Sequence, residues 1–224
     1  MRVDKTAFKH EPLVFFPSTR STRFEHAKRQ ALLAGKRAFD ILGSLSLLPV
    51  MGLTGVTLLL LNPVLNPGPL LYCQIRMGRH CKPFCAIKFR TMAPLCGPET
   101  RGAEDPLEQD RIPPLGQLLR KSRIDELPQI LNVLRGEMSL IGPRPDAIDH
   151  AQHFLRTVPG YRERHALRPG ISGLAQVTVG YVEGSEGTRA KVAADLVYIS
   201  RSSFRLEAKI IGLTLLTILR LRGA

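Results

Sequence analysis

Two adjacent carboxylates, Asp125 and Glu126, directly follow a cationic run at 120–123. Neighbouring positions on a helix point about 100° apart, so these side chains are poorly placed to share one proton as an aspartic-protease pair does. They suit two separate tasks instead, with one carboxylate acting as nucleophile or base and the other holding a cation. The pair therefore predicts chemistry on an anionic group beside a bound metal ion.

Mg²⁺ is the cation that fits these carboxylates, because it binds few protein carboxylates and completes its shell with water and phosphate oxygens. A purely structural interpretation of the same residues stays open. Asp125 is a good helix N-cap, Glu126 suits the positive start of a helix, and Pro128 is tolerated in the first turn. Local features alone do not decide between a catalytic pair and a capped helix.

Two arginines stand in proline-rich turns, where they have lost part of their freedom. Arg144 lies between two prolines, and Arg168 precedes Pro169. A guanidinium held in this way can bind phosphate at two points. Lys88 lies near the end of an extended stretch and offers a further cation. Each of these residues alone could be a surface salt bridge or a solvated strand edge, so only their joint presence favours a phosphorylated substrate.

The charge of the chain implies an anionic partner. Its 224 residues carry a formal net charge of +13, with a pI near 10.2. Nucleic acid, an anionic lipid surface and a phosphorylated substrate all satisfy such a charge. The sequence has no Trp, four Tyr and no run that alternates aromatic with basic residues, which argues against nucleic acid. Basic residues flank the apolar segments, and this favours lipid headgroups and phosphates.

The four cysteines, Cys73, Cys81, Cys85 and Cys96, gather in one part of the chain. Their spacing contains no CxxC pair, and no pair of histidines follows at zinc-finger spacing. We therefore expect reduced thiols in a cytoplasmic domain rather than a structural zinc site.

A largely apolar run at 39–61 contains Pro49 near its middle and has basic residues on both flanks. A spanning helix normally keeps its positive excess on the cytoplasmic side only. We therefore expect a segment that enters the membrane, bends at Pro49 and returns; a plain spanning helix with a proline kink is the alternative. Carbonyls freed at the bend need partners, and Ser44 and Ser46 lie within a turn of it. Asp40 would sit at the membrane entry, within reach of water or of the basic flank.

The rest of the pattern predicts short elements separated by turns. Extended stretches are expected at 70–75 and 84–89, and a loop rich in proline and acid at 93–114. Helices are expected at 22–39, 115–122, 126–134, 147–157 and 206–221. The first of these is basic and suits a headgroup surface, and the last is either core or interfacial.

Several ordered motifs resemble the bacterial sugar transferases, which are monotopic polyprenyl-phosphate phosphoglycosyl transferases. The matching stretches are Lys36-Arg37-Ala38-Phe39-Asp40, Lys88-Phe89-Arg90-Thr91-Met92, Asp125-Glu126-Leu127-Pro128-Gln129, Asn132-Val133-Leu134-Arg135-Gly136-Glu137-Met138-Ser139, Gly142-Pro143-Arg144-Pro145, and the run from Arg168 to Val177. The resemblance implies transfer of a sugar-1-phosphate from a nucleotide diphosphate sugar, usually a UDP-sugar, to a membrane polyprenyl phosphate. Such a transfer starts the assembly of a surface polysaccharide or glycoconjugate.

By this resemblance, Asp125 attacks the sugar-linked phosphorus, releases UMP and carries the phosphosugar until the lipid phosphate takes it. Glu126 is the expected Mg²⁺ ligand. The side chains expected to bind substrate are Lys88, Arg120, Arg144, Arg168 and Gln176. The family's membrane helix breaks at a Ser-Pro pair, whereas this chain has Leu48-Pro49, so another hydroxyl must serve or the break differs.

The expected fold is a helix-rich α/β one: a re-entrant helix–break–helix and a compact cytoplasmic catalytic domain with amphipathic surface helices. We assign a loose tail to 1–22, a basic helix with the membrane hairpin to 23–66, and the catalytic domain to 67–224. The expected place is the cytoplasmic face of a bacterial inner membrane. Nucleotide sugar and polyprenyl phosphate are the expected partners, nucleic acid is not, and a homodimer stays open. A non-catalytic membrane scaffold of a polysaccharide assembly complex is the alternative.

Overall fold

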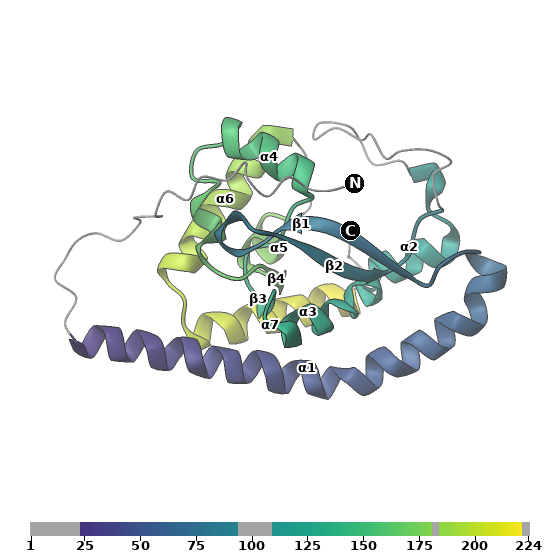
Figure 1. The fold of residues 1–224 in the computed structure, drawn as a ribbon, viewed down its shortest axis with the longest axis horizontal. Helices are drawn as coiled ribbons and strands as arrows, with labels where there is room; N and C mark the ends of the chain where they lie inside the picture. The colour runs from purple at the N-terminus through teal and green to yellow at the C-terminus, as the bar shows by residue number, and fades with distance from the viewer. Residues whose placement is uncertain (1–22, 94–108, 181–183, 221–224) are drawn as a thin grey trace.

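The computed structural model describes residues 23–93, 109–180 and 184–220 and has a helix-rich α/β architecture (Figure 1). Its elements in chain order are α1 (Arg23–Leu65), β1 (Leu71–Met77), η1 (Arg79–Cys81), β2 (Pro83–Phe89), η2 (Gln109–Arg111), α2 (Pro114–Lys121), η3 (Ile124–Glu126), α3 (Gln129–Arg135), β3 (Ser139–Ile141), α4 (Ile148–Thr157), η4 (Glu163–Ala166), β4 (Gly170–Ser172), α5 (Leu174–Thr178), α6 (Gly184–Ser200) and α7 (Phe204–Leu219). The predicted tail at 1–22 and most of the predicted loop at 93–114 lie outside the described residues.

The long helix α1 runs beneath the other elements and is docked to them through polar side chains of its N-terminal half (Figure 1). Arg37 donates to the carbonyls of Val133 at 2.7 Å and Leu134 at 3.1 Å, which lie at the C-terminal end of α3. Asp40 is 2% exposed, and its Oδ1 accepts a hydrogen bond from the Ser139 hydroxyl at 2.9 Å. The prediction that Asp40 reaches water at a membrane entry is therefore wrong, because β3 covers it.

The C-terminal half of α1 contacts the same body of the protein. Leu58 is buried against Phe89 of β2 and Leu119 of α2. The turn that follows is closed by hydrogen bonds from Asn66 Nδ2 to the Arg90 carbonyl at 3.1 Å and from Arg90 Nη1 to Asn66 Oδ1 at 2.8 Å. Both halves of α1 thus pack on one domain, on the same side of the helix.

The opposite face of α1 is apolar and uncovered. Within the described residues, Ala31–Leu65 is one helical segment that is long and apolar enough to cross a membrane. Its large exposed side chains include Leu42, Leu45, Val50, Leu53, Val56, Leu59, Leu60 and Val64. A contiguous apolar face of this size marks a membrane or protein contact rather than a solvated surface.

The predicted break at Leu48-Pro49 appears as a bend within one continuous helix (Figure 1). Pro49 donates no hydrogen bond to the carbonyl of Leu45 four residues earlier. Neither serine supplies the missing donor: the Ser46 hydroxyl donates to the Gly43 carbonyl at 2.8 Å, and the buried Ser44 hydroxyl has no partner among the described residues. The prediction that one of them caps the opened turn is wrong.

The first two strands form an antiparallel hairpin that places Cys73 opposite Ile87 and Ile75 opposite Cys85. Cys73 and Cys85 are therefore diagonal neighbours, with Cα atoms 5.6 Å apart and their sulfur atoms in contact. Spacing along the chain could not anticipate this proximity, which follows from strand register; the expectation of reduced thiols stays a prediction. Cys81 is free and buried, and Cys96 lies outside the described residues.

The second sheet is a short parallel pair, β3 and β4, that brings two distant turns together. Gly142 and Gly170 meet so closely that a Cβ on Gly170 would lie 2.1 Å from the Gly142 nitrogen. The Gly170 N–H donates to the Pro143 carbonyl at 2.9 Å. Only glycine allows this approach, which fixes the Arg144 turn against the start of β4.

Most of the expected elements are present. The hairpin strands and the helices α2, α4 and α7 lie close to their predicted ranges. The helix expected at 126–134 begins instead at Gln129, because the chain first makes the 3-10 turn η3. The helices α5 and α6 were not predicted.

Candidate active site

The two adjacent carboxylates lie in the tight turn η3, between α2 and α3. Arg123, which opens the turn, has a left-handed backbone with φ 59° and ψ 11°, a conformation that is uncommon outside glycine and clusters at functional sites. Asp125 is 7% and Glu126 is 3% exposed. Pro128, not Asp125, holds the N-cap position of α3. The interpretation of Asp125 as a cap is therefore wrong.

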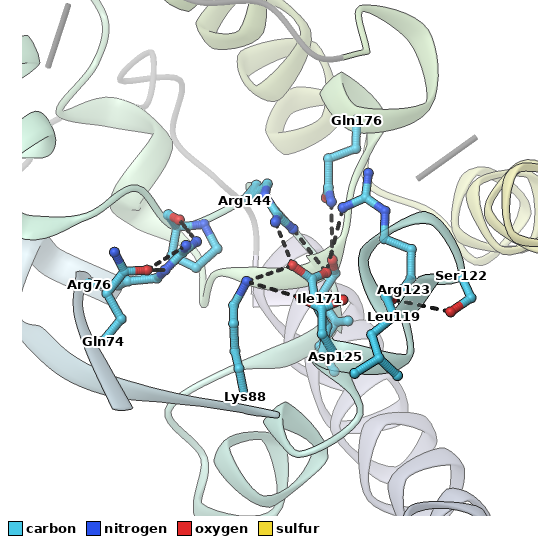
Figure 2. A network of polar contacts seen from close by, with 12 residues as sticks. Gln74, Arg76, Lys88, Leu119, Ser122, Arg123, Asp125, Arg144, Ile171 and Gln176 are labelled. Atoms are coloured by element: carbon cyan, nitrogen blue, oxygen red, sulfur yellow. Dashed lines mark hydrogen bonds and ion pairs between the residues drawn. The ribbon is translucent and has the colours of Figure 1, made fainter. Parts of the chain in front are cut away.

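Glu126 is held by three cations from three parts of the chain. These cations, Lys88, Arg123 and Arg144, are labelled in Figure 2. Arg144 reaches both of its oxygens, with Nη1 3.1 Å from Oε2 and Nη2 bonded to Oε1. Lys88 Nζ lies 2.9 Å from Oε1, and Arg123 Nη1 lies 3.6 Å from Oε2. Burial by itself would raise the pKa of Glu126, but Arg144 and Lys88 together hold it well below its usual range. Glu126 is therefore a permanent anion.

Asp125 is the less stabilised of the two carboxylates. Its nearest cation is Lys88, whose Nζ lies 3.9 Å from Oδ2. Burial raises the pKa of Asp125, Lys88 opposes the rise, and the neighbouring charge of Glu126 adds to it. Environments that move the pKa values of two neighbouring carboxylates in opposite directions suit two different roles. The weakly paired Asp125 is the carboxylate whose oxygens remain available to react.

Lys88 links the acidic pair to β2, and its surroundings change the pKa of its ammonium group. Burial lowers the pKa of its ammonium group to about 8, Glu126 opposes this, and the positive charges of Arg76 and Arg144 reinforce it. Lys88 is therefore mostly protonated at neutral pH and titrates just above it.

The predicted substrate-binding residues divide into two groups. Lys88 and Arg144 contact the acidic pair directly, and the charge of Arg120 acts on Asp125 from the last turn of α2. Arg168 lies elsewhere, with Nε donating to the Gly136 carbonyl at 2.8 Å. The charges that act on Arg168 are those of Arg37, Arg79 and Asp40.

Gln176 points toward the acidic turn beside Arg123 (Figure 2). Its Nε2 donates to the Ile171 carbonyl at 3.2 Å, while its buried Oε1 has no partner among the described residues. A buried acceptor without a donor is costly, so Gln176 is placed to accept a hydrogen bond from a bound ligand. Its role in substrate binding stays a prediction.

Sequence reasoning missed two cations at this site: Arg123, which it named only as part of a cationic run, and Arg76. Arg76 lies on β1 beside Lys88 and Arg144, and Gln74 holds its guanidinium (Figure 2). The charge of Arg76 lowers the pKa of Lys88. The charges of Glu126 and Asp125 in turn raise the pKa of Arg76. The available signal was a basic residue within a strand that alternates exposed and partly buried positions.

The donor set limits how a metal ion can bind. No group of three His, Cys, Asp or Glu side chains in the described parts of the chain could form a protein cage for a metal. Both oxygens of Glu126 already contact cations. Mg²⁺, however, commonly binds through one or two carboxylates plus substrate phosphates. Asp125 and Glu126 thus fit Mg²⁺ only when phosphate oxygens complete its shell.

Comparison with known proteins places this geometry in a family. Residues 31–221 match the model of the bacterial sugar transferases. A UDP-N-acetylgalactosamine-undecaprenyl-phosphate N-acetylgalactosaminephosphotransferase of Aeromonas hydrophila is 40% identical over 190 residues, which cover 84% of this chain and 44% of that protein. The chain thus spans less than half the length of this relative.

Two further relatives match over most of both chains. The exopolysaccharide production protein PSS of Rhizobium leguminosarum bv. phaseoli is 41% identical over 79% of this chain and 90% of its own length. A UDP-glucose:undecaprenyl-phosphate glucose-1-phosphate transferase of Caulobacter vibrioides is 37% identical over 91% of this chain and 78% of its own length. The chain belongs to the bacterial sugar transferase family.

Proposed function

We propose that this protein transfers a sugar-1-phosphate from a UDP-sugar to undecaprenyl phosphate or a similar polyprenyl phosphate, with release of UMP. The observation that carries the proposal is a buried carboxylate pair facing an excess of cations, Lys88, Arg123 and Arg144. Such an excess suits a diphosphate. The names of the relatives from Aeromonas and Caulobacter describe this reaction class with two different sugars.

Asp125 is the proposed nucleophile. Its carboxylate oxygen attacks the phosphorus next to the sugar, and the phosphoanhydride bond to UMP breaks with its electron pair leaving on UMP. The aspartyl phosphosugar is then attacked by an oxygen of the polyprenyl phosphate, and the bond to Asp125 breaks, which restores the carboxylate. Phosphoryl transfer needs mainly positioning and charge stabilisation, and Lys88 and Arg144 supply both.

Mg²⁺ is the proposed cofactor, with Glu126 as its main protein ligand and Asp125 adjacent. When bound, the ion would neutralise charge that develops on the departing phosphate. In the free protein, Lys88 and Arg144 form ion pairs with the carboxylate of Glu126. Arrival of a diphosphate gives both cations an alternative anion, which frees Glu126 for the metal.

For α1 we propose a re-entrant position in one leaflet, with the domain on the cytoplasmic face of the inner membrane. Support comes from the packing of both halves of α1 on one domain, through Asp40 and Leu58. A helix that crossed the bilayer could not keep both contacts on one side. The uncovered apolar face is then turned to lipid, and the site lies where a water-soluble donor meets a lipid acceptor.

The catalytic proposal is tested with purified protein, a panel of UDP-sugars, polyprenyl phosphate and Mg²⁺. We expect UMP release with at least one sugar, and a donor-derived adduct on Asp125 by peptide mass spectrometry when the lipid is omitted. An adduct on another residue, or UMP release that survives Asp125→Asn, would remove Asp125 as nucleophile. No release with any sugar would favour the scaffold alternative.

The membrane proposal is tested with protease-cleavable tags at the two ends of the chain. We expect both tags to be cut in inverted inner-membrane vesicles and neither in spheroplasts. One tag cut from each side would establish a full crossing instead.

A further inference from the structure

The guanidinium of Arg76 connects β1 to the turn that carries Arg144. Its Nη1 donates to the Pro145 carbonyl at 2.6 Å. Its Nε and Nη2 both donate to Gln74 Oε1, at 3.0 Å and 2.8 Å. The backbone continues the link, because Arg76 forms an isolated bridge with Ala147. One planar side chain thus spans from its own strand to the residue after Arg144.

Arg76 differs from the arginine of an ordinary salt bridge because no carboxylate holds its guanidinium. No carboxylate of the described residues lies within salt-bridge distance of it, and its contacts are an amide oxygen and a carbonyl. Burial and the charge of Arg144 lower the pKa of Arg76 to about 10, while Glu126, Asp146 and Asp125 oppose the shift. It remains a cation at neutral pH. Its hydrogen bonds go to Gln74 and to the turn at Pro145, so they fix the position of that turn instead of neutralising a carboxylate.

Arg144 depends on this anchor. Its two bonds to Glu126 require the turn backbone to be fixed. One hydrogen bond fixes its own carbonyl, from Arg164 Nη2 at 2.8 Å. The other fixes the next carbonyl, at Pro145, and comes from Arg76. Small displacements of a group that contacts a reacting phosphate lower the reaction rate strongly. The hydrogen bond from Arg76 should therefore affect the rate of transfer.

We propose that Arg76 is a positioning residue for the transfer reaction, which acts by holding Arg144 in the orientation that meets the donor diphosphate. This inference rests on the proposed function. Arg76 works through its planar shape, which reaches Gln74 and Pro145 at once, and not through its charge alone. Lysine has a single ammonium group and cannot reproduce that span.

The test is a double-mutant cycle between Arg76→Met and Arg144→Met, read out as kcat/KM and as UDP affinity by calorimetry. We expect Arg76→Met to lower kcat/KM by about 10- to 100-fold, because this is the change that the loss of one charged hydrogen bond produces. In the Arg144→Met background the same change should cost less than about threefold, because residues that act as a unit are not additive. Arg76→Lys should recover little of the loss.

The control is Lys82→Met, which removes an exposed charge from the turn of the same hairpin and should leave kcat/KM within about twofold of wild type. Should Arg76→Met fail to fold, Gln74→Met replaces it in the cycle, because it loosens the guanidinium and keeps the charge. Equal losses with and without Arg144, or rescue by Arg76→Lys, overturn the assignment. A wild-type protein that neither binds UDP nor releases UMP overturns the proposed function first.

Discussion

Two arginine–carboxylate clusters lie at the two ends of the segment 144–146, and they differ in charge balance. In the cluster at Glu126, three cations lie within 3.6 Å of one carboxylate: Lys88, Arg123 and Arg144. In the second cluster a single buried arginine lies between two carboxylates. The first therefore carries surplus positive charge, and the second, with one arginine against two carboxylates, carries none.

The second cluster is centred on Arg164, which is 2% exposed. It pairs with Asp146 at 2.6 Å and with Asp195 of α6 at 2.8 Å. The Tyr161 hydroxyl donates to the same Asp146 oxygen at 2.6 Å. Burial lowers and the two aspartates raise the pKa of Arg164, and the aspartates prevail, so its pKa is higher than usual. This cluster ties η4 to α6 and to the turn at Asp146 that precedes α4.

This difference distinguishes the cluster at Arg164, which supports the fold, from the cluster at Glu126, which can bind a ligand. A cluster without surplus positive charge offers nothing to an external anion and holds elements in place, whereas one with surplus cations is completed by an external anion. The two clusters share one backbone segment, since Arg164 also donates to the carbonyl of Arg144. The cluster at Arg164 thus steadies the cluster at Glu126.

The largest expected effect comes from removing the reactive carboxylate. Asp125→Asn should lower UMP release by about 10⁴-fold or more, as expected for loss of a nucleophile. It should also raise the free energy of unfolding by about 0.5–2 kcal/mol, because burial already disfavours the charged Asp125. Chemical denaturation and a UMP assay measure the two quantities. Loss of activity with loss of stability would mean that Asp125 belongs to the structural cluster.

Arg164→Met should lower the free energy of unfolding by about 3–5 kcal/mol, because it leaves Asp146 and Asp195 without their common partner. Urea denaturation measures this. The matched control is Arg156→Met on α4, an exposed arginine that donates only to the carbonyl of Gln152 in its own helix at 3.3 Å. It should change stability by less than about 0.5 kcal/mol. Equal effects of the two variants would contradict the distinction between the clusters.

The pH dependence sharpens the comparison further. Burial lowers the pKa of Lys88 to about 8. Deprotonation above that pH therefore removes a cation from the cluster at Glu126. The value of kcat/KM, which reports the free enzyme, should fall about tenfold between pH 7 and pH 9. Lys88→Arg should abolish this fall, because arginine stays charged. A fall of the same size in Lys88→Arg would assign the titration to another group.

The smallest expected effect concerns the metal. Two positive charges added beside Lys88 and Arg144 are repelled until a diphosphate is present, so metal and nucleotide should bind cooperatively. We expect UDP to raise the affinity for Mn²⁺, used as a paramagnetic substitute for Mg²⁺, by about fivefold, which is the low end of ordinary coupling between two sites. Electron paramagnetic resonance of free Mn²⁺ measures this without turnover. Glu126→Gln should remove the coupling, and equal affinity with and without UDP would contradict it.

Much of the site was predictable because adjacent residues stay adjacent in any fold. The Asp125–Glu126 pair and the turn residues around Arg144 are visible in local types and spacing, whereas the separate roles of the two carboxylates stay a prediction. The hairpin, α2, α4 and α7 follow from apolar patterns and from turn residues. The sequence could not show that Asp125 sits in a 3-10 turn, because Arg123 adopts a left-handed backbone that its residue type does not favour.

The residue types and their order determined a helix long and apolar enough to cross a membrane, an excess of positive charge and one acidic pair. Only the tertiary structure decided which cations meet that pair: Lys88, Arg123 and Arg144 do. Arg168 turns to the Gly136 carbonyl instead. It also decided that Cys73 faces Cys85 and that β3 buries Asp40. The physical reason is that strand register and helix docking depend on contacts between residues far apart in the chain, which no local pattern contains.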